Sequence, residues 1–197
     1  MALPIGVLAL QGDFREHIAA LEHIGVGAVA VRELGELGQI SGLVIPGGES
    51  TVIHKLAVAY GLFEPIQAKI GQGLPMFGTC AGLIMLANTI LDGTADQRSF
   101  GGLDIAVRRN AFGHQSESFE IDLDFEGIDD GPVHAAFIRA PIVETVGPSA
   151  HVVAQLADGR VVGVQQGNLL GISFHPEVTG EYRIHSRFAQ LAGHRPK

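Results

Sequence analysis

The sequence has little of several things that would each point to a particular kind of protein. It contains one cysteine in 197 residues, so no internal disulfide can form and a disulfide-built secreted domain is excluded. Basic residues are few: 13 Lys and Arg stand against 21 Asp and Glu, and the formal net charge of −8 disfavours nucleic acid as a partner. No apolar run approaches the roughly 18 residues that a membrane span needs.

The composition that remains is that of a globular chain. Hydrophobic residues make up 46% and charged residues 17%, which supplies enough apolar material for a sizeable core. The length predicts one domain, covering residues 1–197. Met1–Gln11 is apolar but lacks the basic start of a secretory signal, so we interpret it as a buried first strand. These features together predict a cytoplasmic location.

The first two-thirds of the chain alternate between strand and helix patterns. Short apolar runs predict strands at Ile5–Leu10, Ala28–Val31, Leu43–Ile45 and Pro75–Phe77. Helical spacing predicts helices at about Phe14–Ile24, Thr51–Phe63, Ile66–Ile70 and from Leu83 through Ala87. Asp13 is the expected N-cap of the first helix. This alternation predicts a three-layer, flavodoxin-like α/β sandwich with a mixed, mainly parallel sheet flanked by helices.

The pattern changes after Gly101. Phe119–Phe125 alternates apolar residues with Glu120, Asp122 and Asp124, which predicts a strand with a solvated acidic face. Two apolar runs around Asp158-Gly159 predict a hairpin, since Asp-Gly favours tight turns. A strand at Leu169–Phe174 and a helix at about Tyr182–Ala192 complete the chain.

The sequence gives no support for either of two common phosphate-binding motifs. Gly25–Ala30 has the letters of a dinucleotide fingerprint, but it follows a predicted helix and leads into a strand, whereas the fingerprint must open a helix. No Gly-x-x-x-x-Gly-Lys-[Ser/Thr] loop is present. We therefore expect no nucleotide, and no other organic cofactor or metal.

The central feature is Gly78-Thr79-Cys80-Ala81-Gly82, between a predicted strand and a predicted helix. This is the form of a nucleophile elbow, with Cys in place of Ser. The glycines allow a sharp turn, and the helix N-terminus favours the thiolate. A lone Cys is usually a small buried hydrophobe, but the elbow context favours a nucleophile.

A thiol nucleophile needs a base, and His175 in Phe174-His175-Pro176-Glu177 is the best candidate. Pro176 biases His175 toward extended backbone, so Glu177 can lie on the same side and orient the ring. Alone, the pair would be a strand-end His beside a surface carboxylate; with the elbow, we predict a Cys-His-Glu triad. A zinc site built on His175, Glu177 and His185 is weaker, because the spacing is wrong and no second Cys exists. The other histidines are expected mostly at the surface: residues 17, 23, 54, 114, 134, 151 and 194.

Pro46-Gly47-Gly48-Glu49-Ser50-Thr51 forms a third candidate feature. A Gly pair at a strand end lets backbone N–H groups approach a ligand, so this loop could supply a second oxyanion donor. It could equally be an ordinary turn capped by Ser50 or Glu49.

Together these segments resemble the class I, triad-type glutamine amidotransferases, and most closely the glutaminase subunits of two-component pyridoxal 5′-phosphate synthases. The matching stretches run in order along nearly the whole chain: Ile5–Gly12, Pro46–Thr51, Pro75–Leu83, Arg109–Gly113, Phe137–Pro141 and Ser173–Glu177. Many amidotransferases share the elbow and the His-Pro-Glu pair; the other segments point to these glutaminase subunits. One departure is His114, where a basic Arg would be expected.

The resemblance implies a mechanism and a set of site residues. Cys80 would attack the side-chain carboxamide of L-glutamine, with His175 and Glu177 as the rest of the triad, and the products would be glutamate and ammonia. The amides of Gly48 and Ala81 would hold the oxyanion. The glutamine pocket would be lined by Gly47, Gly48, Glu49, Arg109, Ile138 and Arg139. Arg109 or Arg139 would pair with the substrate α-carboxylate, and Gln11 would sit near the oxyanion loop and the partner interface.

The resemblance also implies a partner, the pyridoxal 5′-phosphate synthase subunit, which would receive the ammonia in a larger heteromeric complex for vitamin B6 biosynthesis. The residues alone are also compatible with two other functions that would use Cys80. One is an amidotransferase subunit that serves another pathway, such as imidazole glycerol phosphate synthesis. The other is a redox sensor or chaperone that uses Cys80 without His175. A non-enzymatic binding subunit is a further alternative.

Overall fold

The computed structural model describes residues 2–109 and 118–197. Its strands are β1 (Ile5–Leu8), β2 (Ala28–Val31), β3 (Gly42–Ile45), β4 (Met76–Thr79), β5 (Ala87–Ile90), β6 (Leu103–Arg108), β7 (Ser118–Leu123), β8 (Val133–Ile138), β9 (Ile142–Val146), β10 (His151–Gln155), β11 (Val161–Gln166) and β12 (Leu169–Ile172). Its helices are α1 (Phe14–His23), η1 (Glu36–Gly38, a 3₁₀ helix), α2 (Ser50–Ala59), α3 (Phe63–Gly71), α4 (Ala81–Leu86), α5 (Pro176–Thr179) and α6 (Tyr182–Leu191).

Ten of the strands form one mixed sheet. Along its main path the order is β2-β1-β3-β4-β12-β11-β9-β6-β5, and β10 pairs with the side of β11. The first five strands in that order run parallel, whereas β11 is antiparallel to both β12 and β9. The remaining strands, β7 and β8, form a separate antiparallel ribbon. The predicted mixed α/β architecture is confirmed.

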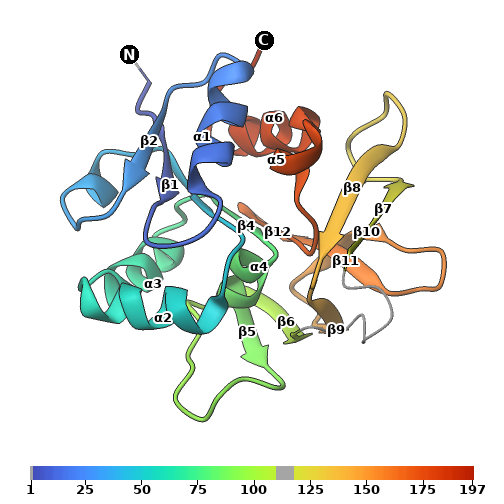
Figure 1. The fold of residues 1–197 in the computed structure, drawn as a ribbon. Helices are drawn as coiled ribbons and strands as arrows, with labels where there is room; N and C mark the ends of the chain where they lie inside the picture. The colour runs from blue at the N-terminus through green and yellow to red at the C-terminus, as the bar shows by residue number, and fades with distance from the viewer. Residues whose placement is uncertain (1, 110–117) are drawn as a thin grey trace.

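Helices cover both faces of this sheet and give it three layers (Figure 1). Side chains that alternate along the parallel strands feed two cores: Leu43 and Ile45 of β3 pack with α2, α3 and α4, whereas Val44 packs with α1 and α6. Strands buried on both faces read as continuous apolar runs, which is the pattern that the sequence shows there. No helix in the described ranges combines the length and apolar character needed to cross a membrane.

Several predicted boundaries were wrong. The helix expected to continue to Phe63 ends at Ala59, because Gly61 takes a φ of 66° and the Leu62 N–H bonds the Ala57 carbonyl, which closes a Schellman-type end. The helix expected to include Ala87 stops at Leu86, and Ala87 begins β5. Strands β5, β6, β8 and β9 were not predicted, whereas the hairpin around Asp158-Gly159 is confirmed as β10–β11.

The acidic face of β7 is more than a solvated surface. The His134 side chain on β8 bonds Asp122 through Nδ1 at 2.6 Å and Glu120 through Nε2 at 2.9 Å. These two hydrogen bonds raise the pKa of His134. An exposed imidazolium therefore neutralises part of a face that was expected to carry only acids.

Candidate active site

Four parallel strands bring the sequence-predicted site to one edge of the sheet. β1, β3, β4 and β12 are neighbours with the same direction, so their carboxyl ends meet. The residues that follow those ends are Gln11, the Gly47-Gly48 pair, Cys80 and His175. In open α/β sheets this edge is where ligands bind.

Cys80 occupies a sharp turn between β4 and α4, with φ 50° and ψ −104°. Its N–H extends the sheet by bonding the Ile172 carbonyl at 2.8 Å. The turn is possible only because of the flanking glycines: a Cβ on Gly78 would lie 2.5 Å from the Gly82 backbone, and a Cβ on Gly82 would collide with the Ile45 carbonyl. Few residues other than glycine adopt such backbone angles, so Cys80 is held in a strained conformation of the kind that clusters at functional sites.

His175 is held by Glu177. Its Nδ1 lies 2.7 Å from Glu177 Oε1, and both side chains are buried. Burial lowers the pKa of His175, but hydrogen bonds to Cys80 and Glu177 and the charges of both outweigh it and raise the pKa to about 10. Since Nδ1 faces Glu177, Nε2 is left for the thiol. This arrangement places an imidazole that Glu177 orients beside the Cys80 thiol, as nucleophilic catalysis by cysteine requires.

Asp13 is a second carboxylate at His175, and the sequence reasoning gave it a different role. It stands at the N-cap position of α1 but makes no side-chain cap bond. Its Oδ2 lies instead 3.6 Å from His175 Nδ1. Burial raises the pKa of Asp13 more than His175 lowers it.

Asp13, His175 and Glu177 are also close enough together to hold a metal ion. The set fits proton handling better. A metal on Nδ1 would replace the N–H that Glu177 Oε1 accepts at 2.7 Å, a distance normal for a charge-assisted hydrogen bond.

The Gly47-Gly48 loop lies directly against the histidine. A Cβ on Gly47 would collide with the His175 ring, and one on Gly48 would collide with the Gln11 side chain. The Gly47 carbonyl accepts from the Asp13 N–H at 3.2 Å, and Gln11 Oε1 accepts from the Glu49 N–H at 2.8 Å. Asp13 and Gln11 therefore hold the loop beside His175.

Besides the amide of Gly48, the amide of Ala81 is predicted to donate to the oxyanion. Ala81 is the first residue of α4, so its N–H has no partner within the helix. It directly follows Cys80, which is the position of the first oxyanion donor in nucleophile elbows.

Of the two caps that the sequence allowed for this turn, Ser50 and Glu49, the structure shows Glu49. Its carboxylate caps α2 by accepting from the N–H groups of Thr51 and Val52, at 3.2 and 2.9 Å. Burial acts to raise the pKa of Glu49, but those bonds and the charge of Arg109 together lower it. Glu49 is therefore an ionised helix cap, 3.7 Å from the Arg109 guanidinium.

Arg109 is brought to the same loop by a network that sequence reasoning missed. Its Nη1 donates to Gln97 Oε1 at 2.6 Å and to Thr51 Oγ1 at 3.1 Å. Gln97 in turn donates to Ser50 Oγ at 2.9 Å. No motif marked Gln97, because its loop carries no periodic pattern.

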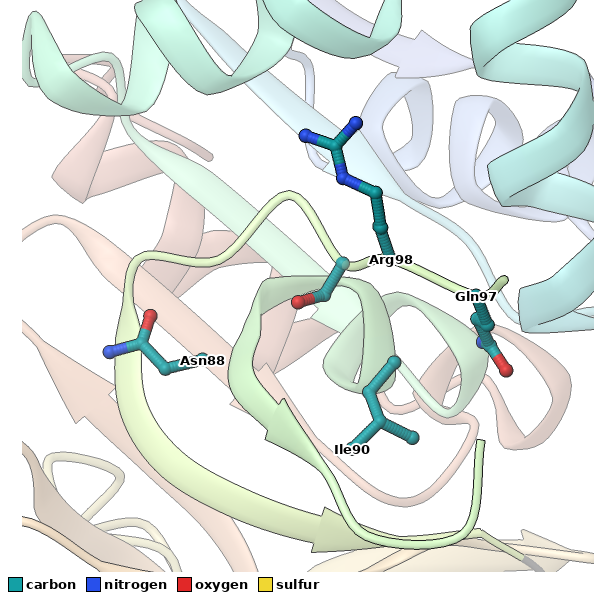
Figure 2. A pocket seen from close by; sticks show the side chains of 5 residues that line it. Asn88, Ile90, Gln97 and Arg98 are labelled. Atoms are coloured by element: carbon teal, nitrogen blue, oxygen red, sulfur yellow. The ribbon is translucent and has the colours of Figure 1, made fainter. Parts of the chain in front are cut away.

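Gln97 also lines a separate open pocket. With Asn88, Ile90, Arg98 and Ser99 it surrounds a hollow beside β5 (Figure 2). Cys80, His175 and Glu177 do not line this pocket. It neighbours the Arg109 network rather than the nucleophile.

Ile138 is the last residue of β8, and Arg139 directly follows it. The Ile138 carbonyl lies 3.9 Å from Cys80 Sγ, so the backbone of this segment touches the nucleophile. Arg139 takes a φ of 44°, one of two positive values among the described non-glycine residues; the other is Cys80. The rest of the Arg109–Gly113 motif, and His114, lie outside the described residues.

Two histidines expected at the surface are buried. His17 is fully buried and His54 is 8% exposed. His17 of α1 faces Thr79, Glu177 and His185, which places it behind the triad.

The family model and a solved structure that match this chain are both described as glutamine amidotransferases. The SNO glutamine amidotransferase family matches residues 7–192. A relative named pyridoxal 5′-phosphate synthase subunit PdxT, from Leifsonia xyli subsp. xyli, is 61% identical over 93% of this chain and 93% of its own. The protein of the same name from Clavibacter sepedonicus is 59% identical over 95% of this chain and 90% of its own. A crystal structure described as a glutamine amidotransferase superposes with a TM-score of 0.90, at 48% identity, over 96% of this chain and 99% of that one.

Proposed function

Because the chain belongs to the SNO glutamine amidotransferase family, we propose that it is a glutaminase, which hydrolyses L-glutamine to L-glutamate and ammonia. Residues 1–197 act as one glutaminase domain. The observation that carries the proposal is the strained Cys80 turn beside a buried His175–Glu177 pair. The ammonia passes to a pyridoxal 5′-phosphate synthase subunit in this proposal, which is supported by relatives that are themselves named as subunits of pyridoxal 5′-phosphate synthase.

The reaction begins with attack of the Cys80 thiolate on the carboxamide carbon of glutamine. The carbonyl oxygen becomes an oxyanion, and the amides of Gly48 and Ala81 donate to it. His175 gives its Nε2 proton to the leaving nitrogen, the C–N bond breaks, and ammonia departs from a thioester. Water, deprotonated by His175, then hydrolyses the thioester, which releases glutamate and restores the thiol.

The substrate's charged end is assigned to the loop around Glu49. Arg109 and Arg139 are the candidate partners of the α-carboxylate, since a guanidinium matches a carboxylate in two parallel bonds. The Arg109 guanidinium is held in place by Gln97 and Thr51, which favours it. Gly47, Gly48, Glu49 and Ile138 line the rest of the pocket in this proposal.

Gln11 supports the oxyanion loop from the first strand. Its hydrogen bond to the Glu49 N–H fixes the backbone one residue beyond Gly48. We assign its outer side to the partner interface. The proposed location is the cytoplasm, where a reducing environment keeps a lone nucleophilic thiol active.

The test is glutamate release from L-glutamine, with and without a pyridoxal 5′-phosphate synthase subunit, for wild type, Cys80→Ala and His175→Ala. Release that needs the synthase and is lost in both variants is the expected result. Release that ignores the synthase would keep the amidase but reject the pathway. Absence of release would reject the enzyme, and unchanged thiol-based function in His175→Ala would favour a redox role.

A further inference from the structure

The carboxylate of Glu177 uses only one of its oxygens on the triad histidine. Oε1 accepts from His175, whereas Oε2 is buried and makes no hydrogen bond within the described part of the chain. Burial raises the pKa of Glu177, with Asp13 adding to it and His175 opposing it. An ionised carboxylate in this position needs a donor at its second oxygen.

His17 is the side chain that faces that second oxygen. Its Nε2 lies 3.5 Å from Glu177 Oε2 and 3.1 Å from Thr79 Oγ1, on the residue just before the nucleophile. Its Nδ1 lies 2.9 Å from His185 Nε2. His17 comes from α1 and His185 from α6, and both are fully buried.

Both imidazoles are neutral, so the position of their protons decides what they can do. Burial lowers the pKa of His17 well below its usual value and that of His185 to about 4, although a backbone hydrogen bond and the charge of Glu181 act to raise the pKa of His185. A single proton lies between His17 Nδ1 and His185 Nε2. When His185 supplies it, the proton of His17 is on Nε2, aimed at Glu177 and Thr79. When His17 supplies it, Nε2 presents a lone pair to the carboxylate.

The first arrangement is the one that stabilises an ionised Glu177, because in the second the Thr79 hydroxyl donates to His17 Nε2 and Glu177 Oε2 has no donor. The triad needs that charge to hold His175 as an imidazolium, and a lone pair 3.5 Å from Oε2 would repel it. We propose that His17 is a positioning residue of the triad: as the Nε2–H tautomer set by His185, it donates to Glu177 Oε2 and keeps that carboxylate ionised and oriented. This proposal rests on the proposed glutaminase function.

The plainer alternative is that His17 and His185 only fill the core between α1 and α6. Two substitutions separate the alternatives. In His17→Gln the amide NH₂ reaches the place of Nε2 and can still donate to Glu177. In His17→Asn the shorter side chain places its amide near the position of Nδ1, so it cannot reach Oε2. Both are polar; Asn has the lower helix propensity, so a purely structural role predicts a somewhat less stable His17→Asn but similar pH profiles for the two variants.

The first readout uses the isolated chain: the pH dependence of Cys80 alkylation by iodoacetamide, which follows the thiolate. Loss of the donor weakens ionised Glu177, and a weaker imidazolium raises the pH at which the thiolate forms. We expect His17→Asn to move the acid limb up by about one pH unit and His17→Gln to leave it near wild type.

The second readout is glutaminase activity with the synthase subunit present. We expect kcat to fall about 10-fold in His17→Asn, the low end for a hydrogen bond to a charged group because the 3.5 Å distance is long. KM should change less than about 2-fold, because His17 is buried behind the triad. His17→Gln should recover most of the loss.

Equal pH profiles and equal kcat for the Gln and Asn variants would overturn the proposal. If His17→Asn does not fold, His185→Leu gives the second test, because it removes the proton donor to Nδ1 while leaving His17 in place. It should shift the alkylation limb in the same direction by a smaller amount, and an unchanged limb would overturn the proposal. Absence of wild-type glutaminase activity would instead reject the proposed function, while the alkylation profiles would still report on His17.

Discussion

Replacing Glu177 by Gln tests how the site keeps its histidine charged. The substitution preserves size and shape but removes the carboxylate that lies 2.7 Å from His175 Nδ1. It also allows the amide to present an NH₂ to Nδ1, which favours the wrong tautomer. Asp13→Asn is a matched control, since its oxygen lies 3.6 Å from the same nitrogen without a hydrogen bond.

The size of the effect follows from the pKa of His175. A rise from 6.5 to about 10 corresponds to about 5 kcal/mol in favour of the imidazolium, at ~1.4 kcal/mol per pH unit. Cys80 and Glu177 both contribute to that stabilisation, so the part that Glu177 supplies is smaller than about 5 kcal/mol. With the wrong tautomer added, we expect kcat to fall about 10³-fold, somewhat less than the ~10⁴-fold of a neutralised acid in the serine-protease triad.

The assay is glutamate release as a function of pH, in the presence of the synthase subunit. In Glu177→Gln the pKa of His175 falls. The rate of glutamate release should therefore drop, and the alkaline limb of its pH profile should move to lower pH. The Asp13 carboxylate is half exposed and screened by water, so Asp13→Asn should cost less than about 5-fold. Equal losses in the two variants would refute the reasoning, because Asp13 would then orient His175 as much as Glu177 does.

Three further predictions concern stability and substrate binding. The pKa of His185 is lowered to about 4 in the folded state, so on acidification the unfolded chain takes up this proton first. The unfolding free energy should therefore fall by about 2 kcal/mol from this group between pH 7 and pH 5. Urea denaturation at several pH values should show that His185→Gln lacks this part of the pH dependence. Gly82→Ala should prevent folding or cost more than ~3 kcal/mol because of its backbone collision, whereas Gly71→Ala, which meets nothing within 4 Å, should be neutral or slightly stabilising in the same denaturation assay. Arg109→Lys should raise the KM for glutamine about 10-fold with little change in kcat, while Arg108→Lys, whose partner is an exposed carboxylate, should leave steady-state kinetics unchanged.

The proximity of His175 and Glu177 and the sharp turn at Cys80 could be predicted from the sequence, because each of these features carries a local signal. Cys80 stands in a five-residue elbow, and His175 and Glu177 stand two apart around a proline. The fold class followed from strand–helix alternation, and parallel strand ends then had to converge. Local patterns of this kind need no knowledge of distant contacts.

The parts that were missed depend on contacts between distant segments. His17 and His185 are 168 residues apart, and no local pattern links them. Asp13 has the right residue type and position for an N-cap, yet its carboxylate lies beside His175 and makes no hydrogen bond to the helix N–H groups. β6 is a different case, because Leu103, Ile105 and Val107 alternate and are buried, so its signal was present in the sequence.

The strain at Cys80 predicts a conflict between stability and activity. At φ 50° and ψ −104° an L-residue is held in a region that costs about 1–3 kcal/mol, and the turn cannot relax without losing the Cys80 N–H bond to Ile172. Both Cys80→Ala and Cys80→Gly remove the thiol and abolish activity, but only glycine relieves the strain. We therefore expect Cys80→Gly to be more stable than Cys80→Ala by about 1 kcal/mol, after the greater chain entropy of glycine is offset. Urea denaturation of the two variants measures the difference, and an alanine variant as stable as the glycine one would mean that the elbow stores no strain at its nucleophile.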